Sequence, residues 1–229
     1  MQTAVSPRDF RPLCRAAWYL SIAMLLLIPL QILVYVLVPP PATVAGFFEL
    51  YRSQPFLGLL SLDFLYLFSN SIVIVLYLAL AALLWEERPA IILPALVLGL
   101  VGLASYYPSN PSFEMLTLSA RYALAAPSEQ SIFLAAGEAL LAGYTGTAFD
   151  VYYVLSTVCL LLFSYAILQC PRFHRRVGVV GLVSGFFMIV PSSAGMLGMV
   201  FSLLSLPPWI AFVALLLPYF RKASTAIEK

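Results

Sequence analysis

"LSLDFLYLFSNSIVIVLYL", residues 60–78, is long and apolar enough to cross a lipid bilayer, and it decides the fold class. Its one charged residue is Asp63. The rest of the chain has the same character, since 62% of the 229 residues are hydrophobic and only 10% are charged. A soluble globular protein needs more charged surface than this composition supplies. The sequence therefore predicts an integral membrane protein.

Six apolar segments are predicted to span the membrane as helices, each long enough for a hydrocarbon core of about 30 Å. The stretch 177–220 contains no charged residue and must hold two spans, because one helix of that length is about twice the bilayer thickness. Its turn is placed best at 191–195, with Pro207 and Pro208 as the other candidate. The fold class is then an all-α membrane protein, a single-domain bundle of six transmembrane helices over residues 1–229. The spans are 16–38, 57–85, 90–107, 146–170 and two within 177–220.

The basic residues predict the orientation of the chain, because Lys and Arg accumulate in cytoplasmic loops. Six spans place both termini on one side, and that side holds 10 of the 12 basic residues. The opposite side keeps only Arg52 and Arg121. We therefore expect cytoplasmic termini, an external segment at 108–145 and no nucleic-acid partner. The first apolar run is longer than that of a signal peptide and is expected to remain as the first span.

Motifs that mark catalysis or cofactor binding are absent from the sequence. The three cysteines suggest no disulfide framework. The single histidine, His174, lies in a basic cluster and lacks neighbouring ligands for a metal ion. We therefore expect no cofactor and no metal site, and the sequence leans against an enzyme.

A polar pattern, D-x-x-Y-x-x-S-[N/T], occurs in the second and in the fourth predicted span, 87 residues apart. On a helix with 3.6 residues per turn, these polar residues form one stripe. Both spans enter from the outer side, so the two aspartates are expected at similar depth. The stripes are Asp63, Tyr66, Asn70 and Tyr77 in one span, and Asp150, Tyr153, Thr157 and Ser164 in the other.

Three interpretations of these stripes remain open. Polar side chains in membrane spans often hydrogen-bond neighbouring helices and have no further role. Ionisable groups there also mark pathways for ligands, ions or protons. The third interpretation is chance similarity between two apolar helices. If Asp63 and Asp150 do face one another, we expect them to share a proton near neutral pH.

Two outer segments are predicted to lie in the membrane interface. The connection 108–145 is too long and too apolar for a plain linker, and its pattern predicts helices at 113–126 and 128–144. The shorter segment 41–55 is rich in aromatic residues, which prefer the interface. These segments either roof an outward-facing cavity or pack on the membrane with no cavity beneath.

A stripe of small residues in the fifth span comprises Gly178, Gly181 and Gly185. Small residues let helix backbones approach closely. We interpret this stripe as packing inside the bundle in preference to dimerisation.

The run LAAPSEQSIFLAAGEALLAGYTGTAFDVYYVLSTVCLLLFSYAILQCPRFHRRVGVVGLVSG, residues 124–185, follows an Arg-flanked first span and the acidic LDFLYLF of residues 62–68. With these features the chain resembles a family of bacterial six-span membrane proteins known as a domain of unknown function. The most specific parts are AGEALL, GTAF and VGVVGLVSG. The resemblance implies a multi-pass protein of the bacterial cytoplasmic (inner) membrane, and it transfers no activity and no functional residue.

The expected function is therefore argued from the polar stripes alone. The first hypothesis is an outward-facing polar pocket that binds a small amphiphile or cation. The alternative is a structural or accessory subunit of a larger membrane complex, with the lipid bilayer and a membrane-protein partner as its contacts. The residues of the predicted pocket are Asp63, Tyr66, Asn70, Asp150, Tyr153 and Thr157.

Overall fold

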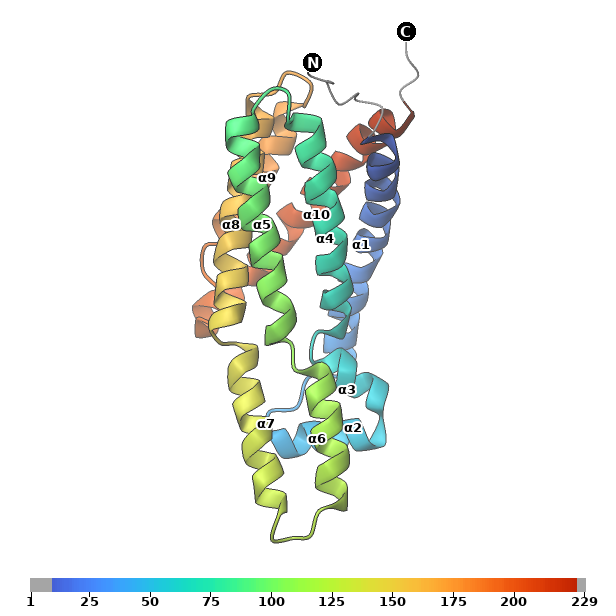
Figure 1. Cartoon of the computed structure of the whole chain (residues 1–229), viewed down its shortest axis with the longest axis vertical. Coiled ribbons are helices and arrows are strands. Elements are labelled where there is room, and N and C mark those ends of the chain that lie inside the picture. The colour runs from blue at the N-terminus through green and yellow to red at the C-terminus, as the bar shows by residue number, and fades with distance from the viewer. Residues whose placement is uncertain (1–9, 226–229) are drawn as a thin grey trace, which may run out of the picture. The chain divides into compact units, whose positions relative to one another are not determined.

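A computed structural model describes residues 10–225, which consist of α-helices and their connections and contain no β-strand (Figure 1). This agrees with the predicted all-α class. The helices are α1 (Arg11–Leu37), α2 (Val44–Ser53), α3 (Pro55–Ser61), α4 (Phe64–Leu84), α5 (Pro89–Ser109), α6 (Ser112–Leu124), α7 (Gln130–Tyr144), α8 (Thr147–Leu168), α9 (Arg175–Phe187) and α10 (Gly195–Thr225).

Five stretches of helix in the described chain are long and apolar enough to cross a membrane, where the sequence predicted six. The missing one is α9, whose 13 residues rise only about 20 Å. The chain leaves the helix after Phe187 and α10 begins at Gly195, so the turn falls at the 191–195 site. Gly195 has a positive φ of 63°, which suits a residue without a side chain. The five stretches are Arg11–Leu37, Phe64–Leu84, Pro89–Leu124, Gln130–Leu168 and Gly195–Thr225.

The predicted second span is not one continuous helix, which corrects the expectation for residues 57–85. α3 ends at Ser61 and α4 begins at Phe64. Asp63 lies between them in the left-handed backbone region, with a φ of 59°. Aspartate tolerates this region better than most residues, and a residue in that conformation cannot continue a right-handed helix. Asp63 therefore stands at a break before α4 and not on the helical stripe.

The described residues belong to two compact units. Within the described residues, unit 1 comprises 10–26, Asn70–Leu103 and 153–225, and unit 2 comprises Leu27–Ser69 and Ala104–Tyr152. Helices α1, α4, α5 and α8 each contribute residues to both units.

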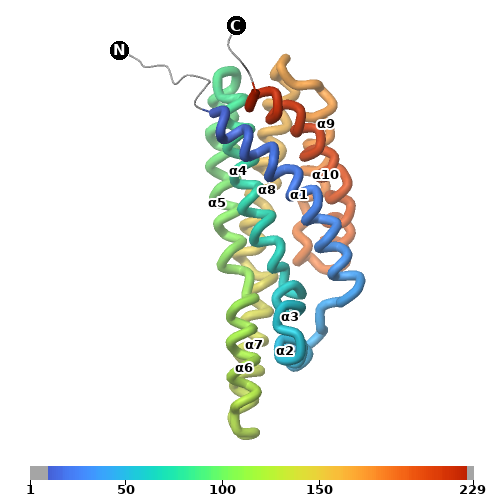
Figure 2. The backbone as a smooth tube through the Cα atoms, turned by 90° about the vertical axis from the view of Figure 1, so that its right-hand side faces the viewer, coloured from blue at the N-terminus to red at the C-terminus, as the bar shows by residue number. Residues whose placement is uncertain are grey.

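Unit 2 is built around a hairpin of two helices, α6 and α7, which lie side by side (Figures 1 and 2). Helix α2 packs against both, and it packs against α3 as well. The buried core of this unit consists of Val44, Phe47, Phe48, Tyr51, Leu62 and Met115. The helices predicted at 113–126 and 128–144 are thus present as α6 and α7.

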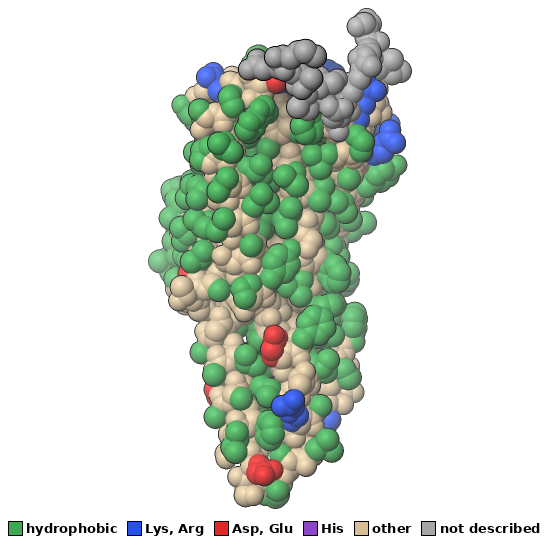
Figure 3. All heavy atoms as spheres, in the orientation of Figure 1, with side chains coloured by type: hydrophobic (Ala, Val, Ile, Leu, Met, Phe, Trp, Pro, Cys, Tyr) green, Lys and Arg blue, Asp and Glu red, His purple; other side chains and the backbone are tan. Residues whose placement is uncertain are grey.

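Unit 1 contains the antiparallel pair α9 and α10, which pack against each other (Figure 1). Over α4 and α5 the visible face is covered by hydrophobic side chains, while Lys and Arg side chains gather at one end of the helices (Figure 3). An apolar band bounded by basic residues is the pattern of helices that cross a bilayer.

Candidate functional site

Asp63 is held by two tyrosines that are distant from it in the sequence. The Tyr35 hydroxyl, on α1, donates to Oδ1 of Asp63, and the Tyr144 hydroxyl, at the end of α7, donates to Oδ2. All three residues belong to unit 2. Among the described residues no basic side chain forms an ion pair with Asp63. The carboxyl group is therefore satisfied by neutral phenols and has no counter-charge.

The backbone next to Asp63 is fixed by a second set of side chains. The Leu62 carbonyl accepts hydrogen bonds from Asn110 Nδ2 at 2.6 Å and from Ser112 Oγ at 2.9 Å. The Ser112 carbonyl in turn accepts from the Tyr51 hydroxyl at 2.9 Å. Burial raises the pKa of Tyr51, so its phenol stays a donor over the physiological range. These bonds tie α2, the α3–α4 break and the start of α6 together, and they hold Asp63 in its unusual backbone conformation.

A buried amide lies one helical turn from Tyr35 on the same side of α1. Gln31 is only 7% exposed, and it lies beside the Tyr35 hydroxyl. By distance and angle neither its Oε1 nor its Nε2 forms a hydrogen bond with the described residues, although the amide is close enough to interact with the Tyr35 hydroxyl. Buried polar groups are nearly always satisfied by protein, water or a ligand, so this amide marks a place where a further polar group belongs.

Aromatic rings surround this region of unit 2. The Tyr106 ring lies 5.8 Å from the Tyr66 ring and 5.0 Å from the Tyr152 ring, centroid to centroid. The Tyr106 hydroxyl is also 3.5 Å from Asn110 Nδ2. Tyr66, one of the predicted site residues, therefore belongs to the aromatic cluster near Asp63.

The other predicted site residues are distributed over both units. Asp150 lies in the first turn of α8, in unit 2, and is partly buried. Asn70, Tyr153 and Thr157 are buried and belong to unit 1. The Thr157 hydroxyl lies 2.8 Å from the Tyr153 carbonyl and 2.7 Å from the Met188 carbonyl, where α9 ends. Thr157 thus has a structural role, and the shared pocket of Asp63 and Asp150 stays a prediction.

The predicted glycine stripe lies against α8 and α10. A Cβ atom at Gly181 would meet Ser164 Oγ at 2.2 Å and the Phe212 ring at 2.8 Å. At Gly178 it would lie 2.6 Å from Leu168 Cγ, and at Gly185 2.7 Å from Leu161 Cδ2. A side chain at any of these positions therefore requires the neighbouring side chains or helices to shift.

A charged cluster in unit 1 links two connections between helices. Arg172 Nε lies 2.6 Å from Glu87 Oε1, and Arg172 Nη2 donates to the Leu83 carbonyl at 2.8 Å. The Cys170 thiol and Arg172 hold the pKa of the Glu87 carboxyl below its usual value. Burial raises the pKa of Cys170, so this thiol is not activated as a nucleophile. Within residues 10–225 no group of three or more His, Cys, Asp and Glu side chains is placed to hold a metal ion.

Sequence reasoning missed Tyr35, Tyr144 and Gln31, which lie outside the repeated pattern. A polar Gln31 within an apolar helix was a usable signal, since such residues usually face protein. The tyrosines gave no such signal, because the membrane interface is rich in tyrosine.

Comparisons with protein-family models, with curated proteins and with solved structures found no match to this chain. The function is therefore argued from the residues themselves.

Proposed function

We propose that the chain is a multi-pass protein of a bacterial cytoplasmic membrane, with both termini in the cytoplasm and residues 41–55 and 108–145 outside. α9 with residues 188–194 supplies the sixth crossing, and α2, α6 and α7 lie at the outer interface. The charges support this orientation, because the described part of unit 1 is basic and unit 2 is acidic. Unit 1 has Arg11, Arg15, Arg88, Arg172, Arg175, Arg176, Arg221 and Lys222 against Glu86 and Glu87, while unit 2 has Arg52 and Arg121 against Glu49, Asp63, Glu114, Glu129, Glu138 and Asp150.

The proposed function is the binding of a small organic cation, an amine with an apolar part, at Asp63. The observation that carries it is the partly buried Asp63 carboxylate with two phenol partners and no counter-charge, near the unsatisfied amide of Gln31. A carboxylate has about four lone-pair sites, and the two tyrosines use two of them. The remaining sites, with Gln31 Oε1, are acceptors that an ammonium group can satisfy.

The aromatic cluster supports a cation in preference to a neutral ligand. Tyrosine faces attract organic cations, with an energy of about 0.5 to 2 kcal/mol for each well-placed ring. Tyr66, Tyr106 and Tyr152 also supply apolar surface for the hydrocarbon part of an amphiphile. In the wider form of the proposal, Asp150, which belongs to the same unit as Asp63, supplies a second carboxylate for the cation.

The proposal is tested with n-octylammonium as the probe and the purified full chain in neutral detergent. Calorimetry should show saturable binding of n-octylammonium, and n-octanol, with the same tail and no charge, should bind at least tenfold more weakly. Asp63→Asn keeps a residue that tolerates a left-handed backbone and removes the charge. It should raise the dissociation constant at least tenfold, as loss of a charge-assisted hydrogen bond of about 1.5 kcal/mol or more requires.

The matched control is Glu138→Gln, which removes an acid from an exposed position of the same unit. It should leave the affinity within about twofold of the unaltered protein. Asp150→Asn reports on the wider pocket: a loss equal to that of Asp63→Asn supports it, and no loss limits the site to the Asp63 region. Equal binding of n-octanol and n-octylammonium, or unchanged affinity in Asp63→Asn, would rule the amine site out.

A second candidate, an accessory subunit, is favoured by the tip of the α6–α7 hairpin. Leu124 there is 89% exposed and Ile132 is 65% exposed, on the two sides of the connecting turn. Exposed apolar side chains at a loop tip are typical of a contact with another protein or with the membrane surface. A partner that stays bound in mild detergent and is released by Leu124→Asp would support this function over the amine site.

A further inference from the structure

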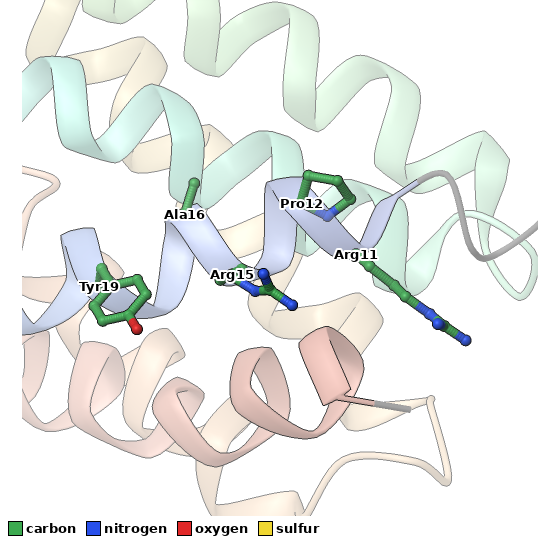
Figure 4. Close-up of a pocket in the computed structure, with 5 residues that line it drawn as sticks. All are labelled: Arg11, Pro12, Arg15, Ala16 and Tyr19. Atoms are coloured by element: carbon green, nitrogen blue, oxygen red, sulfur yellow. The ribbon is translucent and has the colours of Figure 1, made fainter. Parts of the chain in front are cut away.

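A shallow cavity of about 340 Å³ lies on the first turns of α1, in unit 1. Its long side chains, Arg11, Arg15 and Tyr19, leave the same side of the helix, while Pro12 and Ala16 complete its lining (Figure 4). This surface is far along the sequence from Asp63 and has the opposite charge.

No acidic side chain of the described residues neutralises the two arginines in this cavity. They are four residues apart on one helix, where two like charges destabilise the helix by a few tenths of a kcal/mol. Within residues 10–225 neither of them is in an ion pair; the pairs present there are Arg52 with Glu49 and Arg172 with Glu87. An anion from outside the chain would turn this repulsion into attraction.

The aromatic residues beside the cavity indicate its depth relative to a membrane. The Trp18 ring packs against the edge of Tyr19 at 4.6 Å between centroids, and the Arg221 guanidinium lies 5.8 Å from the Trp18 ring centroid. Trp and Tyr prefer the level of the lipid headgroups. The arginines, one and two turns nearer the helix start, are then at the level of the phosphates.

Beyond Tyr19 the same stripe of α1 becomes apolar. Ile22 and Leu26 follow at spacings of three and four residues, which keeps them on one helix face. Both are exposed, Leu26 by 68%. This order of groups matches a phospholipid. The two guanidinium groups suit its phosphate, the phenol suits its glycerol backbone, and the exposed aliphatic side chains suit its acyl chain.

We infer that Arg11 and Arg15 bind the phosphate of an anionic phospholipid, with Tyr19 donating to its polar backbone and the acyl chain lying along Ile22 and Leu26. Guanidinium groups suit this role because they present paired donors to phosphate oxygens. Basic residues near the cytoplasmic end of a span contribute about 1 kcal/mol each to the binding of anionic lipids. This site is separate from the amine site and does not depend on Asp63.

The experiment measures lipid binding to the full chain in neutral detergent by native mass spectrometry. The probes are dihexanoyl phosphatidylglycerol, which is anionic, and dihexanoyl phosphatidylcholine, which has no net charge. We expect the anionic lipid to bind at least tenfold more tightly. The double variant Arg11→Gln/Arg15→Gln should weaken its binding at least tenfold, as expected when two contacts of about 1 kcal/mol are lost.

The matched control is Arg175→Gln/Arg176→Gln, which removes the same charge from exposed positions of α9 in the same unit. It should change the dissociation constant by less than about threefold. An equal loss in both double variants would mean diffuse attraction to a basic surface, and equal binding of the two lipids would mean apolar contact alone; either result overturns the site.

Two further measurements keep the result interpretable. Arg11→Lys/Arg15→Lys keeps the charges without the paired donors, and it should recover part of the affinity. Inorganic phosphate at 100-fold excess over the lipid should fail to displace it; full displacement would identify a site for free anions and contradict the lipid assignment. Melting temperatures close to that of the unaltered protein verify that the variants are folded.

Discussion

The two units of this chain differ in where their polar side chains lie and in what these side chains bond. In unit 1 small residues bring helices together, and hydroxyl groups such as that of Thr157 bond helix carbonyls. In unit 2 the helices are interrupted at Asp63, and side chains from four separate segments meet there. Unit 1 also contains two buried hydroxyls, Ser156 Oγ and Ser164 Oγ, that have no hydrogen-bond partner among the described residues. Close helix packing suits a structural bundle, whereas a carboxylate with spare acceptors beside an unsatisfied amide suits a binding site.

The largest effect is expected from overpacking in unit 1. Gly181→Leu places a Cβ atom 2.2 Å from Ser164 Oγ and further carbons against Phe212, so helices must separate. We expect a loss of about 3 kcal/mol or more of unfolding free energy, measured by denaturation in mixed micelles. Gly143→Leu is the control, because nothing lies within 4 Å of a Cβ atom there. Equal stability of the two variants would show that the glycine stripe does not pack inside the bundle.

A smaller loss is expected when the break in unit 2 is altered. Asp63→Leu puts a branched side chain in the left-handed region and leaves the hydroxyls of Tyr35 and Tyr144 without their acceptor. We expect a loss of about 1 to 3 kcal/mol. Asp63→Asn should cost less than about 1 kcal/mol, because asparagine tolerates this backbone, its Oδ1 accepts from one phenol and its Nδ2 donates to the oxygen of the other. A larger loss for Asn than for Leu would contradict the role assigned to the break.

Variants of Tyr35 and Tyr144 test whether the hydrogen bonds at Asp63 stabilise unit 2 as a connected set. Tyr35→Phe and Tyr144→Phe each remove one hydrogen bond to the Asp63 carboxylate, and each should cost about 1 to 1.5 kcal/mol. Because they bond the same carboxylate, the double variant should deviate from additivity by at least about 0.5 kcal/mol. In an Asp63→Asn background the coupling should shrink. Strict additivity in both backgrounds would mean that the two phenols act independently of Asp63.

The smallest effect concerns the charged cluster of unit 1. Since the pKa of Glu87 is lowered in the folded protein, its contribution is present above the ordinary value of 4.5 and is lost as the pH falls below it. The side chain is 26% exposed, so we expect less than about 1 kcal/mol. Between pH 6 and pH 3.5 the protein should lose slightly more stability than Glu87→Gln does. Identical pH profiles for both would show that this pair contributes nothing.

Hydropathy predicted the helices of both units well, because apolar runs between charged or Pro-containing connections determine where a membrane helix can form. It did not predict that the helix of the fifth span, α9, is only 13 residues long, and it missed the break in the backbone at Asp63. The predicted polar stripe required a continuous α-helix through Asp63, in which each residue turns the helix by about 100°. The left-handed conformation of Asp63 interrupts that helix.

The partners of Asp63 could not be predicted from one sequence for another reason. Tyr35 is 28 residues away and Tyr144 is 81 residues away, and only the tertiary fold of unit 2 brings them to the carboxylate. The repeated pattern drew attention to Asp150 because of its local similarity, whereas hydrogen bonding depends on which helices pack together. The candidate site was therefore found by its aspartate alone.

The central proposal is that the connections rich in Lys and Arg are cytoplasmic and that the connection between α6 and α7 is outside the cell. The most direct measurement is labelling of single cysteines in intact bacterial cells with a membrane-impermeant maleimide, after replacement of Cys14, Cys159 and Cys170 by Ser or Ala. Glu129→Cys, in the exposed turn of the hairpin, should be labelled in intact cells. Glu86→Cys, in the exposed connection after α4, should be labelled only after the cells are permeabilised. The reverse pattern, or labelling of both positions in intact cells, would contradict the account.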